Sequence, residues 1–342
     1  MIKLNLKKPL VGSFPVYSDV FALMPDGEEA LHWLCNNFIQ IRYFTTVSVI
    51  FFEQYRSLLD TCPFLTHFSC SREIIKNEFH DIHNYAEKMI RQEHYVFLYV
   101  DRYYISGYEE YKVEHHLHEI LLYGFDEKEK IYYCADNIGD GRFGTLECKY
   151  EEFEAAYDAI HDVPFHQNVH LLRLGKWWDV KDEPIRMERI VTLLDDYVNS
   201  YYMNNPQEPF TEMKYGFNIH YEILHDLEEE HRHGDMDVRA MCTLYEQKQL
   251  MTIRFKYLYE KDPKEVYKIL AEFFEGLEKE YYIIRNCITR YIAIQNSPNS
   301  EVRDAVYSKI VRKFQKCIED EKKIWEKIKF TKVCGAYGLD LK

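Results

Sequence analysis

The 342-residue sequence has little glycine and proline, with 13 and 10 residues respectively. An all-β sandwich or barrel needs a turn at the end of every short strand, so this shortage disfavours such folds. Long hydrophobic runs are also lacking, because the most apolar stretch, Thr45–Phe52, is far too short to cross a bilayer. Basic residues number only 43 against 57 acidic ones, and the net charge of −14 argues against binding to DNA or RNA.

Paired cysteines are missing as well. The nine cysteines are an odd number, they form no C-x-x-C pair, and no secretion signal precedes them. The N-terminal residues 1–12 are basic but contain no long apolar segment. Scattered thiols of this kind are typical of a reducing compartment, where they pack as small hydrophobic side chains. We therefore expect a cytoplasmic protein.

The first half of the chain mixes helical and strand patterns. Helices are predicted over Gly27–Tyr43, Ser71–Gln92 and Glu151–Ile160, where apolar residues recur with helical spacing. Short runs rich in β-forming residues predict strands at Tyr95–Val100, Leu117–Tyr123, Lys130–Ala135 and Asn168–Leu174. This half holds 17 basic and 28 acidic residues, so it carries −11 of the net charge.

Strand patterns stop beyond Trp178. Helices are predicted at Pro184–Tyr202 and Asp237–Leu258, then from Asp262-Pro263 and from Ser297-Pro298 onward. A solvated polar linker is expected around His225, His231 and His233. We therefore predict an α+β fold with two domains, an α+β domain over residues 1–180 and a helical bundle over residues 181–342.

One pair of residues points to chemistry. His118 opens an apolar strand, and a second apolar strand ends in Asp136-Asn137, eighteen positions later. If a short turn joins the two strands as an antiparallel hairpin, the two ends lie side by side. The carboxylate can then hold one imidazole nitrogen and leave the other free to act as a base. This arrangement is the His–Asp half of a thiol-hydrolase triad, although a lone histidine on a strand is more often a satisfied core residue.

Four segments resemble the papain-like superfamily, in the branch of the bacteriocin-leader peptidases and the butirosin-biosynthesis protein H family. They are Trp33-x3-Asn37-Phe38-Ile39-Gln40, Asp81-Ile82-His83, Asp101–Ile105, and the pair His118 and Asp136. The chain looks most like the cysteine-peptidase-like proteins of thiotemplated antibiotic pathways, such as the amide-forming enzyme of closthioamide assembly. The resemblance covers about residues 10–160 and implies a papain-like N-terminal domain with N-terminal helices and an antiparallel sheet.

The resemblance also implies roles for individual residues. His118 would be the general base, Asp136 would orient it, and Cys35 would be the nucleophile. The predicted helix Gly27–Tyr43 places Cys35 in mid-helix, however, whereas a reactive thiol gains its low pKa at a helix N-terminus. In an alternative register the nucleophile helix covers Tyr17–Met24, and Val16 stands where family members carry cysteine.

Three further residues are candidates for substrate binding. Tyr103 and Tyr104 would line a substrate pocket or pack in an aromatic core, and Asp101 would be a pocket carboxylate or a strand-end cap. The cluster of His115, His116 and His118 lacks a fourth ligand at a recognisable spacing, so we expect no metal and no cofactor.

The function implied by the resemblance is an acyltransferase or amide-bond-forming enzyme of specialised metabolism, acting on an acyl thioester through a Cys-His-Asp mechanism. The alternatives are a catalytically degenerate homologue that serves as a binding, scaffold or immunity protein, and a peptidase or amide hydrolase. The expected partners are an acyl or peptidyl carrier protein, an amine acceptor and a second copy of the chain through the helical domain, with neither nucleic acid nor membrane. A carrier protein would dock on one basic helix face formed by Lys309, Arg312, Lys313 and Lys316.

Overall fold

The computed structural model describes residues 1–45, 47–52, 58–138, 142–161, 166–175, 183–201, 213–296, 300–333 and 335–342. The chain divides into two compact units. The first consists of Met1–Ala30 and Tyr55–Lys181, and the second of Leu31–Gln54 and Asp182–Lys342. The architecture is mixed α+β, with antiparallel sheets followed by a helical region, which confirms the predicted fold class.

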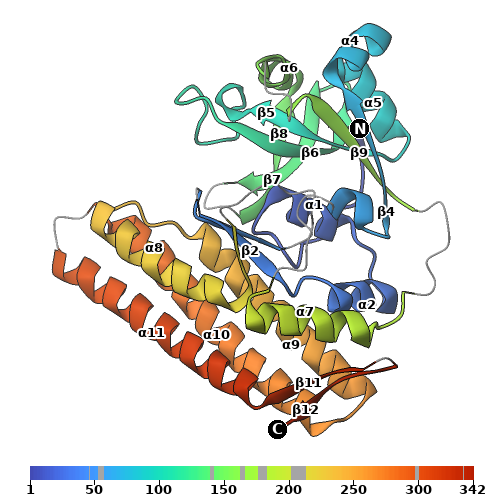
Figure 1. The fold of residues 1–342 in the computed structure, drawn as a ribbon. Helices are drawn as coiled ribbons and strands as arrows, with labels where there is room; N and C mark the ends of the chain where they lie inside the picture. Colours follow the sequence, from blue (N-terminus) through green and yellow to red (C-terminus); the bar gives the residue numbers. More distant parts are fainter. Residues whose placement is uncertain are drawn as a thin grey trace. The chain divides into compact units, whose positions relative to one another are not determined.

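The first unit contains a seven-stranded antiparallel sheet (Figure 1). Its strands run in the order β4 (Leu65–Ser71), β9 (Asn168–Leu174), β5 (Tyr95–Asp101), β6 (Leu117–Asp126), β7 (Ile131–Ile138) and β8 (Arg142–Lys149), with β1 (Ile2–Lys3) paired to β6. A Cβ at Gly124 would lie 2.5 Å from the carbonyl oxygen of Ile2, so the close approach of β1 requires glycine there. The pairing of β6 with β7 is irregular between Leu122 and Gly124.

Helices cover both faces of this sheet (Figure 1). On one side lie α4 (Arg72–Phe79), α5 (Ile82–Arg91) and α6 (Tyr150–Asp158), whose apolar side chains form one core with β5, β6 and β7. The helix α1 (Pro15–Leu23) is buried along its whole length and packs against β6 and β7. The unit also contains the short helices α3 (Leu58–Thr61) and η1 (Arg102–Tyr104).

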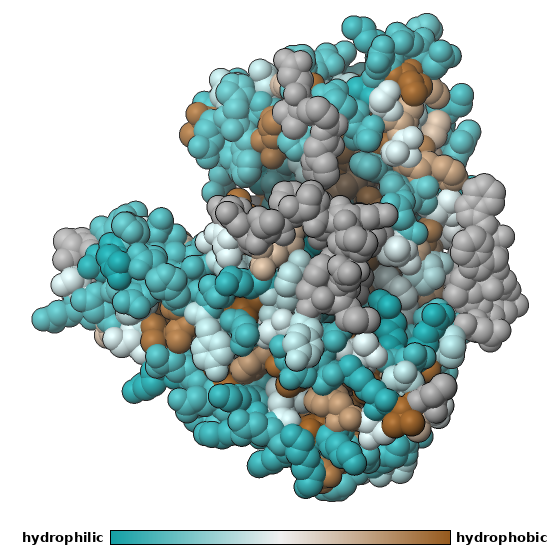
Figure 2. Space-filling model, viewed as in Figure 1, coloured by the Kyte–Doolittle hydropathy of each residue, from teal (hydrophilic) through white to brown (hydrophobic). Residues whose placement is uncertain are grey.

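The second unit is mainly helical. Its helices are α2 (Glu28–Asn36, from Leu31 onward in this unit), α7 (Met187–Asn199), η3 (Gly216–Asn218), α8 (Ile219–His233), α9 (Arg239–Lys261), α10 (Glu265–Ile294) and α11 (Ser300–Glu326). A three-stranded sheet joins β10 (Met213–Tyr215), β2 (Ile41–Phe44) and β3 (Val49–Phe52), and β11 (Ile328–Val333) pairs with β12 (Ala336–Leu341). The visible outer face of α11 is mainly hydrophilic (Figure 2). In the described part of the chain, no helix is both long and apolar enough to cross a membrane.

The structure corrects several predicted elements. The helix predicted over Gly27–Tyr43 ends at Asn36, and the chain then turns at Phe38, whose φ is 55°, into strand β2. The helix predicted over Ser71–Gln92 is broken at His80, where φ is 71°, and Asp81 caps a new helix by accepting a hydrogen bond from the backbone N–H of Asn84.

The second half also differs from its prediction. The stretch expected to be a polar linker around His225, His231 and His233 is helix α8, and it ends at Gly234 in the left-handed conformation. Strands β10, β11 and β12 contradict the prediction that strands stop beyond Trp178. The predicted start of the last helix at Ser297 lies outside the described residues.

Candidate functional site

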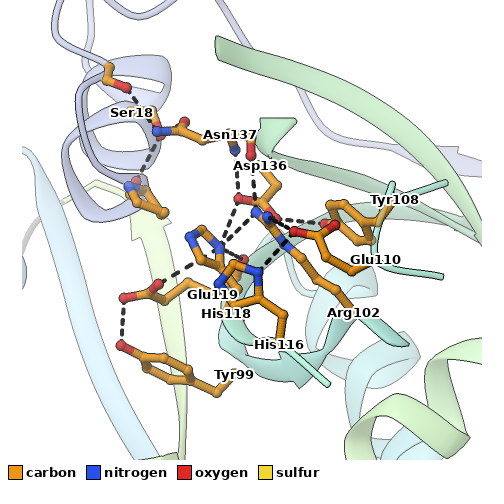
Figure 3. Close-up of polar contacts among 12 residues, drawn as sticks. Ser18, Tyr99, Arg102, Tyr108, Glu110, His116, His118, Glu119, Asp136 and Asn137 are labelled. Carbon is orange, nitrogen blue, oxygen red and sulfur yellow. Dashed lines mark hydrogen bonds and ion pairs between the residues drawn. The ribbon is translucent and has the colours of Figure 1, made fainter. Parts of the chain in front are cut away.

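The hairpin of β6 and β7 brings His118 next to Asp136, as the spacing predicted. Asp126 closes the turn of this hairpin by accepting hydrogen bonds from the backbone N–H groups of Lys128 and Glu129. At the far end of the hairpin, His118 Nδ1 lies 3.4 Å from Asp136 Oδ1 (Figure 3). The side chain of His118 is 22% exposed, and no partner of its Nε2 is found among the described residues. One imidazole nitrogen therefore faces the carboxylate, and the other is available to a ligand.

The carboxylate of Asp136 is also held by other donors. Its Oδ2 accepts hydrogen bonds from Tyr108 Oη at 2.6 Å and from Arg102 Nη2 at 2.8 Å, and its Oδ1 accepts one from the backbone N–H of Asn137 at 2.5 Å. The side chains of Asp136 and Arg102 are 0% and 7% exposed. A buried, hydrogen-bonded ion pair therefore lies directly behind the imidazole.

Arg102 stands between the two members of the expected dyad. Its Nη2 lies 2.8 Å from His118 Nδ1, 2.8 Å from Asp136 Oδ2 and 3.0 Å from the carbonyl oxygen of Asn137 (Figure 3). One guanidinium nitrogen carries two hydrogens, so it cannot satisfy three acceptors at once. Arg102 thus competes with His118 for the carboxylate that would orient a catalytic histidine.

The pKa of His118 reflects both neighbours. Burial disfavours the charged imidazole, but the hydrogen bond and the negative charge of Asp136 outweigh burial and raise the pKa of His118 above its ordinary value. The positive charge of Arg102 acts in the opposite direction. The basicity of His118 is therefore a balance between Asp136 and Arg102.

Helix α1 is attached to the end of β7 by polar contacts. Ser18 Oγ donates to the backbone carbonyl of Pro15 at 2.9 Å and lies 3.1 Å from Asn137 Oδ1, while Asn137 Nδ2 donates to the carbonyl of Gly12 at 2.8 Å (Figure 3). The first turn of α1, which begins at Pro15 and includes Val16, lies next to these contacts. The first turn of α1 therefore lies beside the Asn137 end of β7.

Asp19 is an unexpected acid in the same region. It is 1% exposed, and neither of its carboxylate oxygens has a hydrogen-bond partner among the described residues. Burial, together with the negative charges of Asp136 and Glu119, raises the pKa of Asp19 well above its usual range. The second of these acids, Glu119, accepts a hydrogen bond from Tyr99 Oη at 2.6 Å.

We predict that Asp19→Asn makes the protein more stable at alkaline pH. The raised pKa means that the folded state holds a proton that the unfolded state releases above about pH 4, so wild-type stability falls as the pH rises from there toward the folded pKa. Asparagine is uncharged in both states and removes this loss. We therefore compare the free energy of unfolding of the variant with that of the wild type at two pH values. Measured by urea denaturation, this difference should be about 1–3 kcal/mol more in favour of the variant at pH 8 than at pH 4.

The control for this prediction is Asp26→Asn, because the Asp26 side chain is 95% exposed and its ion pair with Lys7 lies on the surface. A difference between Asp19→Asn and wild type that stays constant from pH 4 to pH 8 would contradict the assignment of Asp19 as a buried, protonated acid.

Cys35 has the properties of a core thiol. It is the last residue but one of α2, it is 0% exposed, and it belongs to the second unit, whereas His118 belongs to the first. Burial raises the pKa of Cys35 to about 11, although the positive charge of Arg254 acts to lower it. A nucleophilic thiol needs a depressed pKa and a helix N-terminus, and Cys35 has neither.

The substrate-binding candidates are engaged in local structure. Asp101 Oδ1 accepts hydrogen bonds from the backbone N–H groups of Tyr103 and His116, both at 3.1 Å, and Asp101 Oδ2 lies 2.6 Å from His115 Nδ1. These contacts are those of a strand-end cap. Tyr103 stacks on His115 with ring centroids 4.2 Å apart, and Tyr104 packs against the hydrophobic core.

The three clustered histidines face three different carboxylates. His115 pairs with Asp101, His116 with Glu110 and His118 with Asp136. Among the described residues, no group of three or more His, Cys, Asp or Glu side chains is arranged to hold a metal ion.

Sequence reasoning overlooked the roles of Arg102 and Asp19. Asp19 carried a usable signal, since it is the one charged residue within the mainly apolar stretch Val16–Met24. Arg102 carried none, because only the fold shows that it reaches the pair on the neighbouring strands. No protein-family model matches the chain, and no curated protein matches it.

Proposed function

We propose that this chain is a papain-like homologue that has lost its cysteine nucleophile and binds an acyl or peptidyl conjugate in specialised metabolism. The observation that carries the proposal is the composition of the site. The His118–Asp136 pair lies 3.4 Å apart beside the N-terminal turn of α1, but that turn contains Val16 where a thiol would be required. The contact of Arg102 with both members of the pair supports the same conclusion.

A second candidate function is hydrolysis of a thioester or amide by water. It is favoured by the open Nε2 of His118, since an imidazole with a raised pKa can activate water at this nitrogen, without a covalent intermediate, when Nδ1 carries the proton and faces Asp136. The cysteine-dependent acyltransferase that the resemblance implies would need a thiol next to this nitrogen.

The experiment offers the protein a simple acyl thioester, S-acetyl-N-acetylcysteamine, and follows covalent mass and thiol release. If the proposal holds, intact-mass spectrometry shows no acetyl adduct on the wild type during the incubation, and release of N-acetylcysteamine stays at the uncatalysed rate. An acetyl adduct that Cys35→Ala abolishes would overturn the proposal in favour of the acyltransferase. Catalysed release without an adduct, abolished by His118→Ala, would overturn it in favour of hydrolysis.

The variant Val16→Cys tests the position of the missing nucleophile. A thiol in the first turn of α1 gains stabilisation of its thiolate from the helix N-terminus and from an imidazolium nearby. We expect alkylation by iodoacetamide at pH 6.5 to be about tenfold faster than for glutathione, because a pKa lowered by one unit increases the thiolate fraction about tenfold there. The companion His118→Ala should slow the reaction, and equal rates with and without His118 would contradict the proposed register.

A carrier protein is the proposed macromolecular partner. The basic face of α11 is partly neutralised, because Lys313 pairs with Glu280 at 2.5 Å and Lys316 with Asp320 at 2.7 Å. Lys309 and Arg312 are exposed on the same helix, and no ion pair of theirs is found among the described residues. These two side chains are the best candidates to contact an acidic partner.

A further inference from the structure

The second unit contains a cavity that the proposed function does not use. Its volume is about 610 Å³, which lies within the range of small-molecule sites. Its walls come from the end of α7, η3, the beginning of α8, the last turns of α11, strand β11 and Lys342. All of its lining residues lie within the described part of the second unit.

One part of the wall is apolar. It consists of aromatic and aliphatic side chains, namely Val198, Phe217, Tyr221, Trp325, Ile328 and Phe330. The indole Nε1–H of Trp325 points toward the interior, where it donates to Glu321 Oε1 at 3.4 Å. Trp325 therefore offers the cavity ring surface, and the apolar wall suits a ligand with an aromatic or acyl body.

The polar part of the wall has more basic than acidic side chains. Lys322, Lys329 and Lys342 line the cavity and are exposed, and in the described part of the chain none of their ammonium groups has an ion-pair partner. Two acids also line the cavity, but the carboxylate of Asp195 is held by Lys332 at 2.6 Å. The other acidic side chain is Glu326, so among the described side chains that line the cavity three ammonium groups and one carboxylate have no ion-pair partner.

We infer that this cavity is a binding site for an organic anion with an apolar body, a carboxylate attached to an aromatic ring or an acyl chain. The ring surfaces of Phe217, Trp325 and Phe330 contact the body. Lysines supply mobile point charges instead of the rigid paired donors of arginine, so they accept a carboxylate without fixing its orientation. The inference does not depend on the chemistry at His118.

The test uses a fluorescent aromatic anion, 8-anilinonaphthalene-1-sulfonate, and its uncharged relative N-phenyl-1-naphthylamine as probes of the full chain. The anion should bind saturably with one site, and it should quench tryptophan emission in the wild type but much less in Trp325→Phe. Its affinity should fall as salt increases from 50 to 300 mM, whereas that of the neutral probe should not.

Two sets of variants locate the charge and the apolar wall. The double variant Lys322→Gln/Lys329→Gln should lower the affinity for the anionic probe about fivefold to tenfold and leave the affinity for the neutral probe unchanged. Lys268 is an exposed lysine of α10 outside the cavity, so the matched control Lys268→Gln should change the affinity for neither probe. Phe330→Ala should lower the affinity for both probes, because it removes part of the apolar wall.

Competition identifies the ligand class. Displacement of the anionic probe by dodecanoate indicates an acyl carboxylate, displacement by 2-naphthoate indicates an aromatic one, and either result supports the site. Failure of both acids to displace the probe, or equal affinity of the double lysine variant and the wild type, would show adventitious dye binding and overturn the inference.

Discussion

Glu321→Leu is expected to lower the free energy of unfolding by about 3–5 kcal/mol, because it leaves the ammonium group of Lys248 buried without a counter-ion. Both side chains are 0% exposed, and Lys248 Nζ lies 2.8 Å from Glu321 Oε2. Urea denaturation at pH 7 measures the loss.

The surroundings of this ion pair explain why it must stay intact. Lys248 Nζ also donates to Gln247 Oε1 at 2.7 Å and to Tyr197 Oη at 2.9 Å, while Tyr197 Oη donates to Glu321 Oε1 at 2.8 Å. Burial lowers the pKa of Lys248, and burial together with the charge of Lys248 lowers the pKa of His220 to about 4. His220, whose Nε2 lies 3.3 Å from Lys248 Nζ, is therefore neutral and offers no negative charge that could replace Glu321.

The control is the double variant Lys248→Met/Glu321→Leu, which removes both charges and should recover most of the lost stability. Asp320→Asn disrupts the exposed pair with Lys316 on the same helix and should cost less than about 1 kcal/mol. If Glu321→Leu alone changed stability by no more than Asp320→Asn, the buried pair would not hold the bundle together. Glu321→Gln provides the same comparison should the leucine variant not fold.

The sequence predicted the hairpin of the candidate site well, for a local reason. Strands β6 and β7 are marked by runs of β-forming residues, and Asp126 with its polar neighbours marks the turn, so His118 and Asp136 had to meet. Because His118 and Asp136 lie eighteen positions apart within one hairpin, the proximity of the two side chains could be predicted without information from elsewhere in the chain.

The end of helix α2 shows what sequence pattern misses. The apolar spacing continues to Tyr43, yet the helix stops at Asn36 because its last carbonyls are satisfied from a distance. Arg254, fully buried on α9, donates to the backbone carbonyls of Cys35 at 2.8 Å and Asn37 at 2.5 Å. A cap supplied more than 200 positions away has no local signal, and the position of Cys35 could not be predicted for the same reason.

The role of Arg102 likewise depends on tertiary structure. Arg102 follows β5, which pairs with β6, and its side chain spans to the end of β7. Neither the charge nor the neighbours of Arg102 in the sequence indicate that it would take part in the pair formed by His118 and Asp136.

Arg102→Leu is expected to have two linked effects. It should lower the free energy of unfolding by about 3–5 kcal/mol at pH 8, because the fully buried carboxylate of Asp136 loses its cationic partner. It should also raise the pKa of His118 above its wild-type value, since a nearby positive charge disappears and Nδ1, no longer in contact with Arg102, can donate to Asp136 Oδ1. NMR titration of the imidazole Cε1–H, assigned with His118→Gln, measures the second effect.

The two effects are coupled through pH. A histidine whose folded pKa is raised contributes stability below its unfolded pKa of about 6.5, and the contribution is lost as the pH rises through the folded value. The destabilisation by Arg102→Leu should therefore be smaller at pH 5.5 than at pH 8, because protonated His118 then neutralises Asp136. Arg102→Lys keeps the charge and should show a smaller effect on both measurements. A pKa of His118 that falls or stays constant in Arg102→Leu would show that Arg102 does not compete for Asp136.

The same change tests why the site would bind a substrate without turning it over. If Arg102 draws Asp136 away from His118, then removing Arg102 moves the pair toward the geometry of a working base. Combined with Val16→Cys, Arg102→Leu should accelerate acetylation by S-acetyl-N-acetylcysteamine beyond the rate of Val16→Cys alone, at a pH below the pKa of the new thiol. Equal rates would leave the absent thiol as the sole reason for the proposed loss of catalysis, and Arg102 would then serve only to neutralise Asp136.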